Sequence, residues 1–488
     1  MGEELVEVKM LIGGDWVEGE TKGTVRNPAC VDEVVGHFGI ASVVSQTEAA
    51  VAAAERAFPS WAATPISRRA EIMVQVVHKT DEVAMGLAPL LTREQGKVLT
   101  EAMLDVGSPE TFFTLCGQMA ERWAEPQVVE DELGKLIIRK EPVGVVAIIS
   151  PWNWPVALTA ISLSQALIAG NCVVVKPSSF TPLTVTKWCE AVANLFPPGV
   201  LNVIHGPGST VGRMLTRHPR VRQVSFRGSS DTGTEVMMDV APTKKRIVLE
   251  LGGNDPAIIL PDVKVDEDLC RSLFYGVFLT SGQVCMAIKR IYAHESIFDQ
   301  FVKVFTEVTN EAVVGNGLDE RATLGPVNNA LQFEKIKGLV AEAKSGGAKV
   351  VEVGKKLDPK GWERGYFHLP TIITGVDASY KIVAEEQFGP VIPIMPYHDI
   401  DEAIRLANDT RYGLCSSIWT SDEEKGFELA KRLEAGYTWV NQHGPLSLDL
   451  EAPFGGWKES GIGRSFGVVG FDGYIEYHTI TNKGTRMS

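Results

Sequence analysis

The segment VVAIISPWNWPVALTAISLSQALIAGNCVVVK (residues 145–176) decides the fold class. Two short apolar runs, Val145–Ile149 and 172–175, flank a longer apolar stretch, 158–169, whose length favours a helix. Further apolar runs follow at 200–205 and 223–226. Strands that alternate with helices at this spacing predict a parallel, doubly wound α/β sheet.

Three other patterns surround this segment. From position 46 to 97, apolar residues recur every three or four positions, which predicts amphipathic helices that cover a sheet. Between 127 and 146, alternating runs with a turn at 132–135 predict a β-hairpin. Beyond position 255, a second series of apolar runs, with helices expected at 266–279 and 296–314, predicts a second α/β unit of comparable size.

The composition is that of a globular protein. Of 488 residues, 44% are hydrophobic and 22% are charged, and the longest apolar runs fall short of the roughly 18 residues that a membrane span needs. The first residues lack the basic and then apolar pattern of a secretion signal, so we expect a cytoplasmic protein without membrane contact. The net charge of −14 argues against nucleic-acid binding.

The cysteines predict reduced thiols. They are odd in number, widely scattered and free of any CxxC pair, so we expect neither a disulfide framework nor a metal site. One of them is available as a nucleophile. The seven are Cys30, Cys116, Cys172, Cys189, Cys270, Cys285 and Cys415.

Four segments combine Gly or Pro with isolated polar residues at the ends of apolar runs, where open α/β sheets place their binding loops. Each has an ordinary structural explanation when taken singly: Cys285 as a small buried hydrophobe, Asn153 as a turn former, Glu250 as a surface charge and Glu386 as a cap. The segments are SPWNWP (150–155), LELGG (249–253), SGQVCM (281–286) and EEQFGP (385–390).

Together with four further motifs, these segments resemble the aldehyde dehydrogenase superfamily along nearly the whole chain. The others are VVVKPSSFTPLT (173–184), VSFRGSS (224–230), ANDTRYGL (407–414) and PFGGWKESGIGR (453–464). The resemblance implies a Rossmann-like cofactor domain (1–121 and 142–251), a second α/β catalytic domain (252–464), and a small oligomerisation domain made of a β-hairpin (122–141) and the C-terminal segment (465–488). A homodimer or homotetramer is expected.

The same resemblance assigns the chemistry. Cys285 is the nucleophile, because a thiolate both attacks an aldehyde and leaves from a thioester. The amide of Asn153 and the backbone N–H of Cys285 form the oxyanion hole, and Glu250 activates the water that cleaves the thioester. Lys176 completes the expected catalytic set. Family members that transfer the acyl group to coenzyme A lack the base, so Glu250 favours hydrolysis.

For the nicotinamide cofactor, the resemblance places Lys176 on the adenosine ribose, and Glu386 with Phe388 against the nicotinamide ribose and ring. The remaining expected contacts lie along the pyrophosphate and nicotinamide side, with two glycines that allow close backbone approach. These contacts are Trp152, Ser229, Leu251, Gly208 and Gly228.

Two positions depart from the family pattern. Ser179 stands where many NAD-preferring members carry a Glu that binds the ribose 2′-OH and repels a 2′-phosphate, so we expect NADP to be accepted, with continued use of NAD as the alternative. Arg227 replaces the usual Thr in FRGS. We expect it to reach solvent or to pair with Asp231, in preference to a ligand role.

The substrate pocket expected from the resemblance suits a medium-sized apolar or aromatic aldehyde. Two alternatives stay open: a semialdehyde dehydrogenase for a carboxylate-bearing substrate, which needs an Arg or Lys at the pocket mouth, and a non-catalytic member of the same fold. The loop 441–451 offers only His443 as a basic group. The expected pocket residues are Trp154, Val284, Met286, His443 and Leu446.

Overall fold

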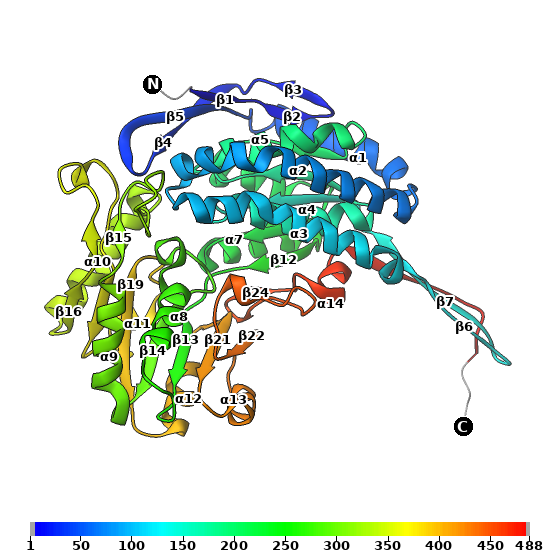
Figure 1. Ribbon diagram of the computed structural model, residues 1–488. Coiled ribbons are helices and arrows are strands. Elements are labelled where there is room, and N and C mark those ends of the chain that lie inside the picture. The colour runs from blue at the N-terminus through cyan, green and yellow to red at the C-terminus, as the bar shows by residue number, and fades with distance from the viewer. Residues whose placement is uncertain (1–4, 485–488) are drawn as a thin grey trace.

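The computed structural model describes residues 5–484, and it has two large sheets, each covered by helices. Figure 1 shows the first sheet and its helices in the upper half of the molecule and the second sheet in the lower half. The first four and last four residues, which include the outer ends of the predicted domains 1–121 and 465–488, lie outside the described residues.

The first sheet has a parallel centre. Its strand order is β24 (Gly461–Ile462), β12 (Arg246–Glu250), β11 (Val221–Arg227), β8 (Val145–Ile149), β9 (Cys172–Lys176), β10 (Leu201–Val203), β2 (Met10–Ile12) and β3 (Asp15–Val17). The five strands from β12 to β10 are parallel. At the two ends of this set, β24 pairs antiparallel with β12 and β2 pairs antiparallel with β10, and β3 pairs antiparallel with β2. Every residue of β8 and β9 is buried, as expected of parallel strands with helices on both faces.

Helix α4 lies directly against this sheet, and all its residues except Leu158 are buried. Pro155 occupies its first turn, where the missing N–H costs no hydrogen bond, and Gly170 ends it with a left-handed φ of 99°. The long helices α2 and α3 pack on each other, and α3 packs on α4. The helices of this half are α1 (Ser45–Ala62), α2 (Ile66–Gln95), α3 (Leu99–Ala124), α4 (Pro155–Ala169), α5 (Pro182–Val192), α6 (Arg213–Arg217) and α7 (Ser230–Val240).

The second sheet has the order β16 (Lys349–Glu352), β18 (Thr371–Thr374), β19 (Val391–Tyr397), β14 (Ile288–His294), β13 (Asp255–Ile259), β21 (Cys415–Trp419) and β22 (Tyr437–Val440). All neighbours pair in parallel except β16 and β18. Its helices are α8 (Glu267–Phe278), α9 (Glu295–Thr309), α10 (Ala330–Ser345), α11 (Lys381–Ala384), α12 (Ile400–Asn408) and α13 (Glu423–Ala430). Only four residues, 251–254, separate Glu250 at the end of β12 from β13 in the second sheet.

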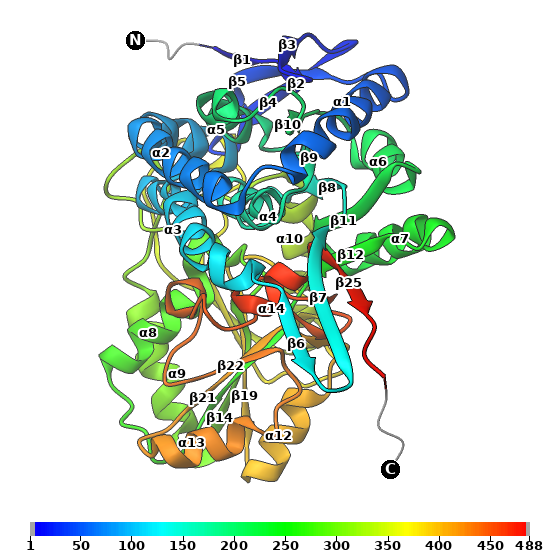
Figure 2. The same ribbon diagram turned by 90° about the vertical axis from the view of Figure 1, so that its right-hand side faces the viewer.

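A narrow sheet projects from the body of the molecule (Figures 1 and 2). It consists of β6 (Gln127–Asp131), β7 (Gly134–Pro142) and β25 (Ile475–Thr481), which follows the short helix α14 (Gly467–Asp472). The pairing of β25 with β7 joins two parts of the chain that the sequence analysis assigned to one oligomerisation domain. The role of this narrow sheet in subunit contact stays a prediction, as do the predicted domain bounds. At the opposite end, β1 (Val6–Val8), β5 (Cys30–Ile40) and β4 (Thr21–Asn27) form another small sheet.

The predicted α/β architecture is confirmed, with three differences in detail. The hairpin ends at Pro142 and not at 146, because Gly144 turns the chain with φ of 124° into β8 of the main sheet. The helix expected at 296–314 ends at Thr309, and β15 (Val313–Val314) instead pairs with β17 (Lys355–Lys356). Helix α3 was not anticipated. Within residues 5–484, no helix is both long and apolar enough to cross a membrane.

Candidate active site

Cys285 lies on a loop that leads into β14, and the start of this loop has an unusual backbone. Thr280 and Ser281 have left-handed φ angles of 53° and 54°, which cost free energy in residues with a Cβ. Buried contacts hold them: Thr280 donates its N–H to Glu101 at 2.9 Å and accepts the Trp154 indole N–H at 3.1 Å. The surrounding structure therefore fixes the path of the chain just before the nucleophile.

Asn153 reaches this loop from the end of β8. Its side chain is 4% exposed, and its amide nitrogen donates to the backbone oxygen of Gln283 at 2.9 Å. A side-chain amide has two N–H groups, so one remains for an oxygen that develops charge beside Cys285. The same bond ties the loop to β8.

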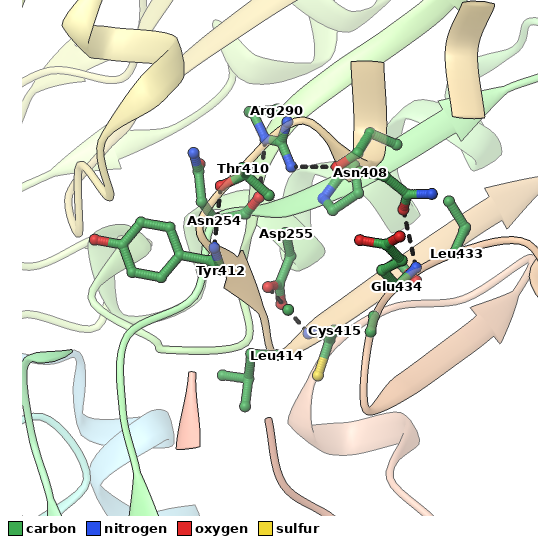
Figure 3. Close-up of a pocket in the computed structure, with 15 residues that line it drawn as sticks. Asn254, Asp255, Arg290, Asn408, Thr410, Tyr412, Leu414, Cys415, Leu433 and Glu434 are labelled. Carbon is green, nitrogen blue, oxygen red and sulfur yellow. Dashed lines mark hydrogen bonds between the residues drawn. The ribbon is translucent and has the colours of Figure 1, made fainter. Parts of the chain in front are cut away.

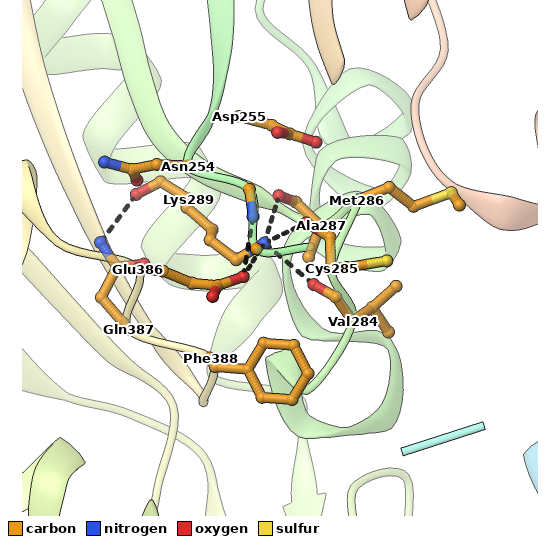
Figure 4. Close-up of polar contacts among 12 residues, drawn as sticks. Asn254, Asp255, Val284, Cys285, Met286, Ala287, Lys289, Glu386, Gln387 and Phe388 are labelled. Carbon is orange, nitrogen blue, oxygen red and sulfur yellow. Dashed lines mark hydrogen bonds and ion pairs between the residues drawn. The ribbon is translucent and has the colours of Figure 1, made fainter. Parts of the chain in front are cut away.

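A buried lysine, Lys289, also binds the Cys285 loop. Figure 4 shows the Lys289 ammonium between the Glu386 carboxylate and the carbonyl oxygens of the loop. Its nitrogen donates to the carbonyls of Val284 at 2.9 Å and Cys285 at 2.6 Å, and lies 3.6 Å from Glu386. Burial raises the pKa of the Cys285 thiol to about 12, although the Lys289 charge opposes this. The resting thiol is therefore protonated at neutral pH.

Arg227 contradicts the sequence expectation. It neither reaches solvent nor pairs with Asp231; its side chain is 5% exposed and forms an ion pair with Glu250, with Nε 2.9 Å from Oε2 and Nη2 3.1 Å from Oε1. The two residues are register partners on the parallel strands β11 and β12, which places the side chains together. Asp231 pairs instead with Arg411 at 3.6 Å.

A cavity of about 500 Å³ opens on one side of Cys285. Its walls are largely apolar, and among the described residues that line it none is Lys or Arg. Three of the apolar residues come from the unanticipated helix α3: Met103, Leu104 and Phe112. Phe454, Phe466, Leu448 and Leu450 come from the C-terminal part of the chain and were likewise missed.

Of the predicted pocket residues, Trp154, Val284, Met286 and Leu446 line this cavity. His443 is not among its lining residues. Its buried ring packs on Trp439, and its Nε2 lies 2.9 Å from the Met286 carbonyl oxygen. His443 therefore contacts Met286, a wall residue, without facing the cavity.

A second cavity, of about 170 Å³, opens on the other side of Cys285. Cys285, Asn153, Glu250 and Leu158 line both cavities, so they lie where the two spaces meet. Six of the residues expected to contact the cofactor line the second one: Trp152, Gly228, Ser229, Leu251, Glu386 and Phe388. Gln332 and Lys335 of α10 also line it, and sequence reasoning missed both.

These residues fit a nicotinamide dinucleotide. The Glu386 carboxylate is an acceptor for ribose hydroxyls, and Ser229 caps the N-terminus of α7, where backbone N–H groups favour a phosphate. The rings of Trp152 and Phe388 meet edge to face at 5.5 Å and leave apolar surface for a planar ring.

The other expected cofactor residues lie farther along the edge of the sheet. Lys176 ends β9, Gly208 begins the turn before α6, and neither lines the cavities beside Cys285. Lys176 therefore does not line the space where the reacting atoms would meet, and its contact with the cofactor stays a prediction. Its buried ammonium has one acceptor among the described residues, the Pro177 carbonyl at 3.0 Å, and burial lowers its pKa to about 8. Ser179 donates to the Gly206 carbonyl at 3.1 Å.

A third hollow lies where β13, β14 and β21 begin, and it has no room for a ligand. Figure 3 shows Asp255 and Arg290 at its wall, and its volume is about 10 Å³. Arg290 is fully buried and donates to three backbone carbonyls, those of Asn254, Leu406 and Ala407. Within residues 5–484 no three His, Cys, Asp or Glu side chains form a metal-binding group.

Known proteins that resemble this chain belong to one enzyme family. A model of the aldehyde dehydrogenase family covers residues 16–480. A chloroplastic betaine aldehyde dehydrogenase of Beta vulgaris is 36% identical over 97% of this chain and 96% of its own length. A mitochondrial succinate-semialdehyde dehydrogenase of Arabidopsis thaliana is 35% identical over 97% of this chain and 88% of its own. The organelles in these names leave the cytoplasm a prediction for this chain.

Two solved structures superimpose closely. The betaine aldehyde dehydrogenase of Staphylococcus aureus, in complex with NAD⁺, has a TM-score of 0.93 at 34% identity. The match covers 97% of this chain and 95% of that one. An NADP-dependent enzyme of E. coli has a TM-score of 0.92 at 32% identity, with 98% of each chain covered. A family match over nearly the whole length, together with relatives above 30% identity, places this chain in the aldehyde dehydrogenase family.

Proposed function

We propose that this aldehyde dehydrogenase oxidises an uncharged, medium-sized apolar or aromatic aldehyde to its carboxylic acid, with NADP or NAD as the acceptor. The observation that carries this proposal is the apolar cavity of about 500 Å³ that ends at Cys285. Among the described residues, no Lys or Arg lines its walls. A carboxylate-bearing substrate would be buried there without a partner charge, which is strongly unfavourable.

The reaction follows from the residues where the cavities meet. The Cys285 sulfur attacks the aldehyde carbon while its proton passes to water, and the oxyanion that forms accepts hydrogen bonds from Asn153 and the Cys285 N–H. The nicotinamide supplies the acceptor for the hydride that leaves this carbon. Cys285 then holds the acyl group as a thioester. Glu250 takes a proton from water, whose oxygen replaces sulfur on the acyl carbon and regenerates the thiol.

A substrate panel tests the proposal. We expect kcat/KM for benzaldehyde and hexanal to exceed that for succinic semialdehyde by about a hundredfold, which corresponds to about 2.7 kcal/mol for an unpaired buried carboxylate. Leu446 is 68% exposed at the cavity mouth, so Leu446→Arg is a tolerated variant that should raise the succinic semialdehyde rate selectively. A wild-type protein that prefers succinic semialdehyde or betaine aldehyde would disprove the apolar assignment.

The cofactor preference gives a second test. The Ser179 hydroxyl already donates to Gly206, so acceptance of NADP depends on the missing carboxylate and on the Lys176 charge. We expect Ser179→Glu to lower kcat/KM for NADP at least about tenfold more than for NAD. Because the Lys176 pKa is about 8, NADP use should decline relative to NAD as the pH rises above 8. A wild-type preference for NAD of about a hundredfold or more would contradict the proposal.

A further inference from the structure

Arg227 is bound more completely than a structural ion pair requires. All five N–H groups of its guanidinium have acceptors: two are the Glu250 oxygens, and the others are the hydroxyls of Ser162 and Ser465 and the Leu158 carbonyl. These acceptors belong to β12, α4 and the segment before α14, so the guanidinium is fixed from several sides. Strands β11 and β12, which carry the pair, lie next to each other in Figure 2.

The arrangement occupies most of the Glu250 carboxylate. Arg227 donates to both oxygens, and the Ser465 hydroxyl donates to Oε1 as well. A carboxylate has about four acceptor positions, so these three donors take most of them and hold the carboxylate in one orientation. Glu250 nevertheless lines both cavities at Cys285, where it must receive the proton of the attacking water.

We infer that Arg227 is a positioning residue that holds Glu250 in a resting position, and that thioester hydrolysis requires the carboxylate to leave at least one of these bonds. The inference rests on the proposed role of Glu250 as the base. Charge-assisted, bidentate hydrogen bonds are among the strongest that side chains make, so releasing one slows the step that needs it. Hydrolysis of the thioester, and not hydride transfer, then limits turnover of this protein.

Arg227→Lys tests whether the positive charge or the two-point hydrogen bonding holds the Glu250 carboxylate. Lysine keeps the positive charge beside Glu250 but presents a single ammonium, which cannot hold both oxygens in a fork. Ser465→Ala removes one donor to Oε1 and one acceptor of Arg227, and it keeps both Arg227 bonds to Glu250. Arg290→Lys is the matched control, because Arg290 is also a fully buried arginine but donates to backbone carbonyls and does not contact Glu250.

The measurement is a single-turnover experiment with benzaldehyde that follows absorbance of the reduced nicotinamide and free benzoate in quenched samples. In the wild type we expect benzoate to lag behind reduction. Arg227→Lys should raise the hydrolysis rate constant about tenfold and Ser465→Ala about threefold, with the reduction rate constant unchanged. Arg290→Lys should alter neither. A purely structural role would instead lower both constants together.

The outcomes are distinct. If Arg227→Lys does not fold, the hydrolysis rate constant of Ser465→Ala still reports the effect of losing one bond to the Glu250 carboxylate. A hydrolysis constant that is unchanged or lower in the folded variants, or wild-type benzoate that appears without a lag, overturns the inference and leaves the proposed function standing. Absence of nicotinamide reduction with every aldehyde of the panel would instead refute the proposed function.

Discussion

Cys285→Ser is expected to lower aldehyde oxidation by about 10⁴-fold or more, a loss similar to removal of a nucleophile in other enzymes. The buried site already raises the pKa of the thiol to about 12, and a hydroxyl is intrinsically harder to ionise and a poorer leaving group. Steady-state formation of reduced nicotinamide measures the loss. Quenching of protein fluorescence by added cofactor should persist, because the cofactor-side cavity keeps its other walls.

Cys30→Ser is the matched control for this variant. Cys30 and Cys285 are the two cysteines that are partly accessible, and the other five are buried. Cys30 lies far along the chain, on β5 beside Arg364, so its replacement should leave the rate unchanged. If Cys285→Ser keeps a substantial fraction of wild-type turnover, Cys285 is not the nucleophile.

Glu250→Gln should separate the two halves of the reaction. A glutamine fills the same space but cannot take a proton from water, so acylation and hydride transfer should proceed once per site. Turnover afterwards should fall by about a hundredfold or more, in the range typical of a lost general base. The expected trace is a burst of reduced nicotinamide close to the enzyme concentration, followed by a nearly flat line.

Hydroxylamine provides the control for Glu250→Gln. Added after the burst, once excess aldehyde has been removed, it attacks the Cys285 thioester without needing Glu250, so it should free the thiol and yield about one hydroxamic acid per site. The variant also leaves the buried Arg227 without its partner charge, so its thermal stability must be measured in the same samples. Loss of the burst in a stably folded variant would mean that Glu250 acts before hydride transfer.

The sequence predicted the parts of the fold that depend on local pattern. The apolar runs of β8 and β9 and the helix between them are short-range features, and the Gly-rich and Pro-rich loops that follow such strands meet at one edge of a sheet by geometry alone. This explains why Asn153 and Glu250, drawn from separate motifs, lie together in the structure. Cys285 comes from the loop before β14 of the second sheet, and the Asn153 bond to Gln283 joins that loop to the same edge.

Features that depend on distant pairing were not predictable in the same way. Helix α3 carries Gly107 and Pro109, which weaken its pattern, yet it supplies a wall of the substrate cavity. The partner of Arg227 lies 23 positions away, whereas the sequence argument considered only a helical neighbour, Asp231. The useful sign was that FRGS and LELGG each end a strand, so their last strand residues could be register partners.

The five acceptors of Arg227 bear on how this position evolves. A single exchange to the family's usual threonine would leave Glu250 without its cation, and it would remove the guanidinium that now donates to Ser162 and Ser465. The benefit of reversion therefore depends on what stands at positions 162 and 465. Arginine at 227 should be inherited together with these serines as a unit, and descendants of this chain should rarely lose it alone.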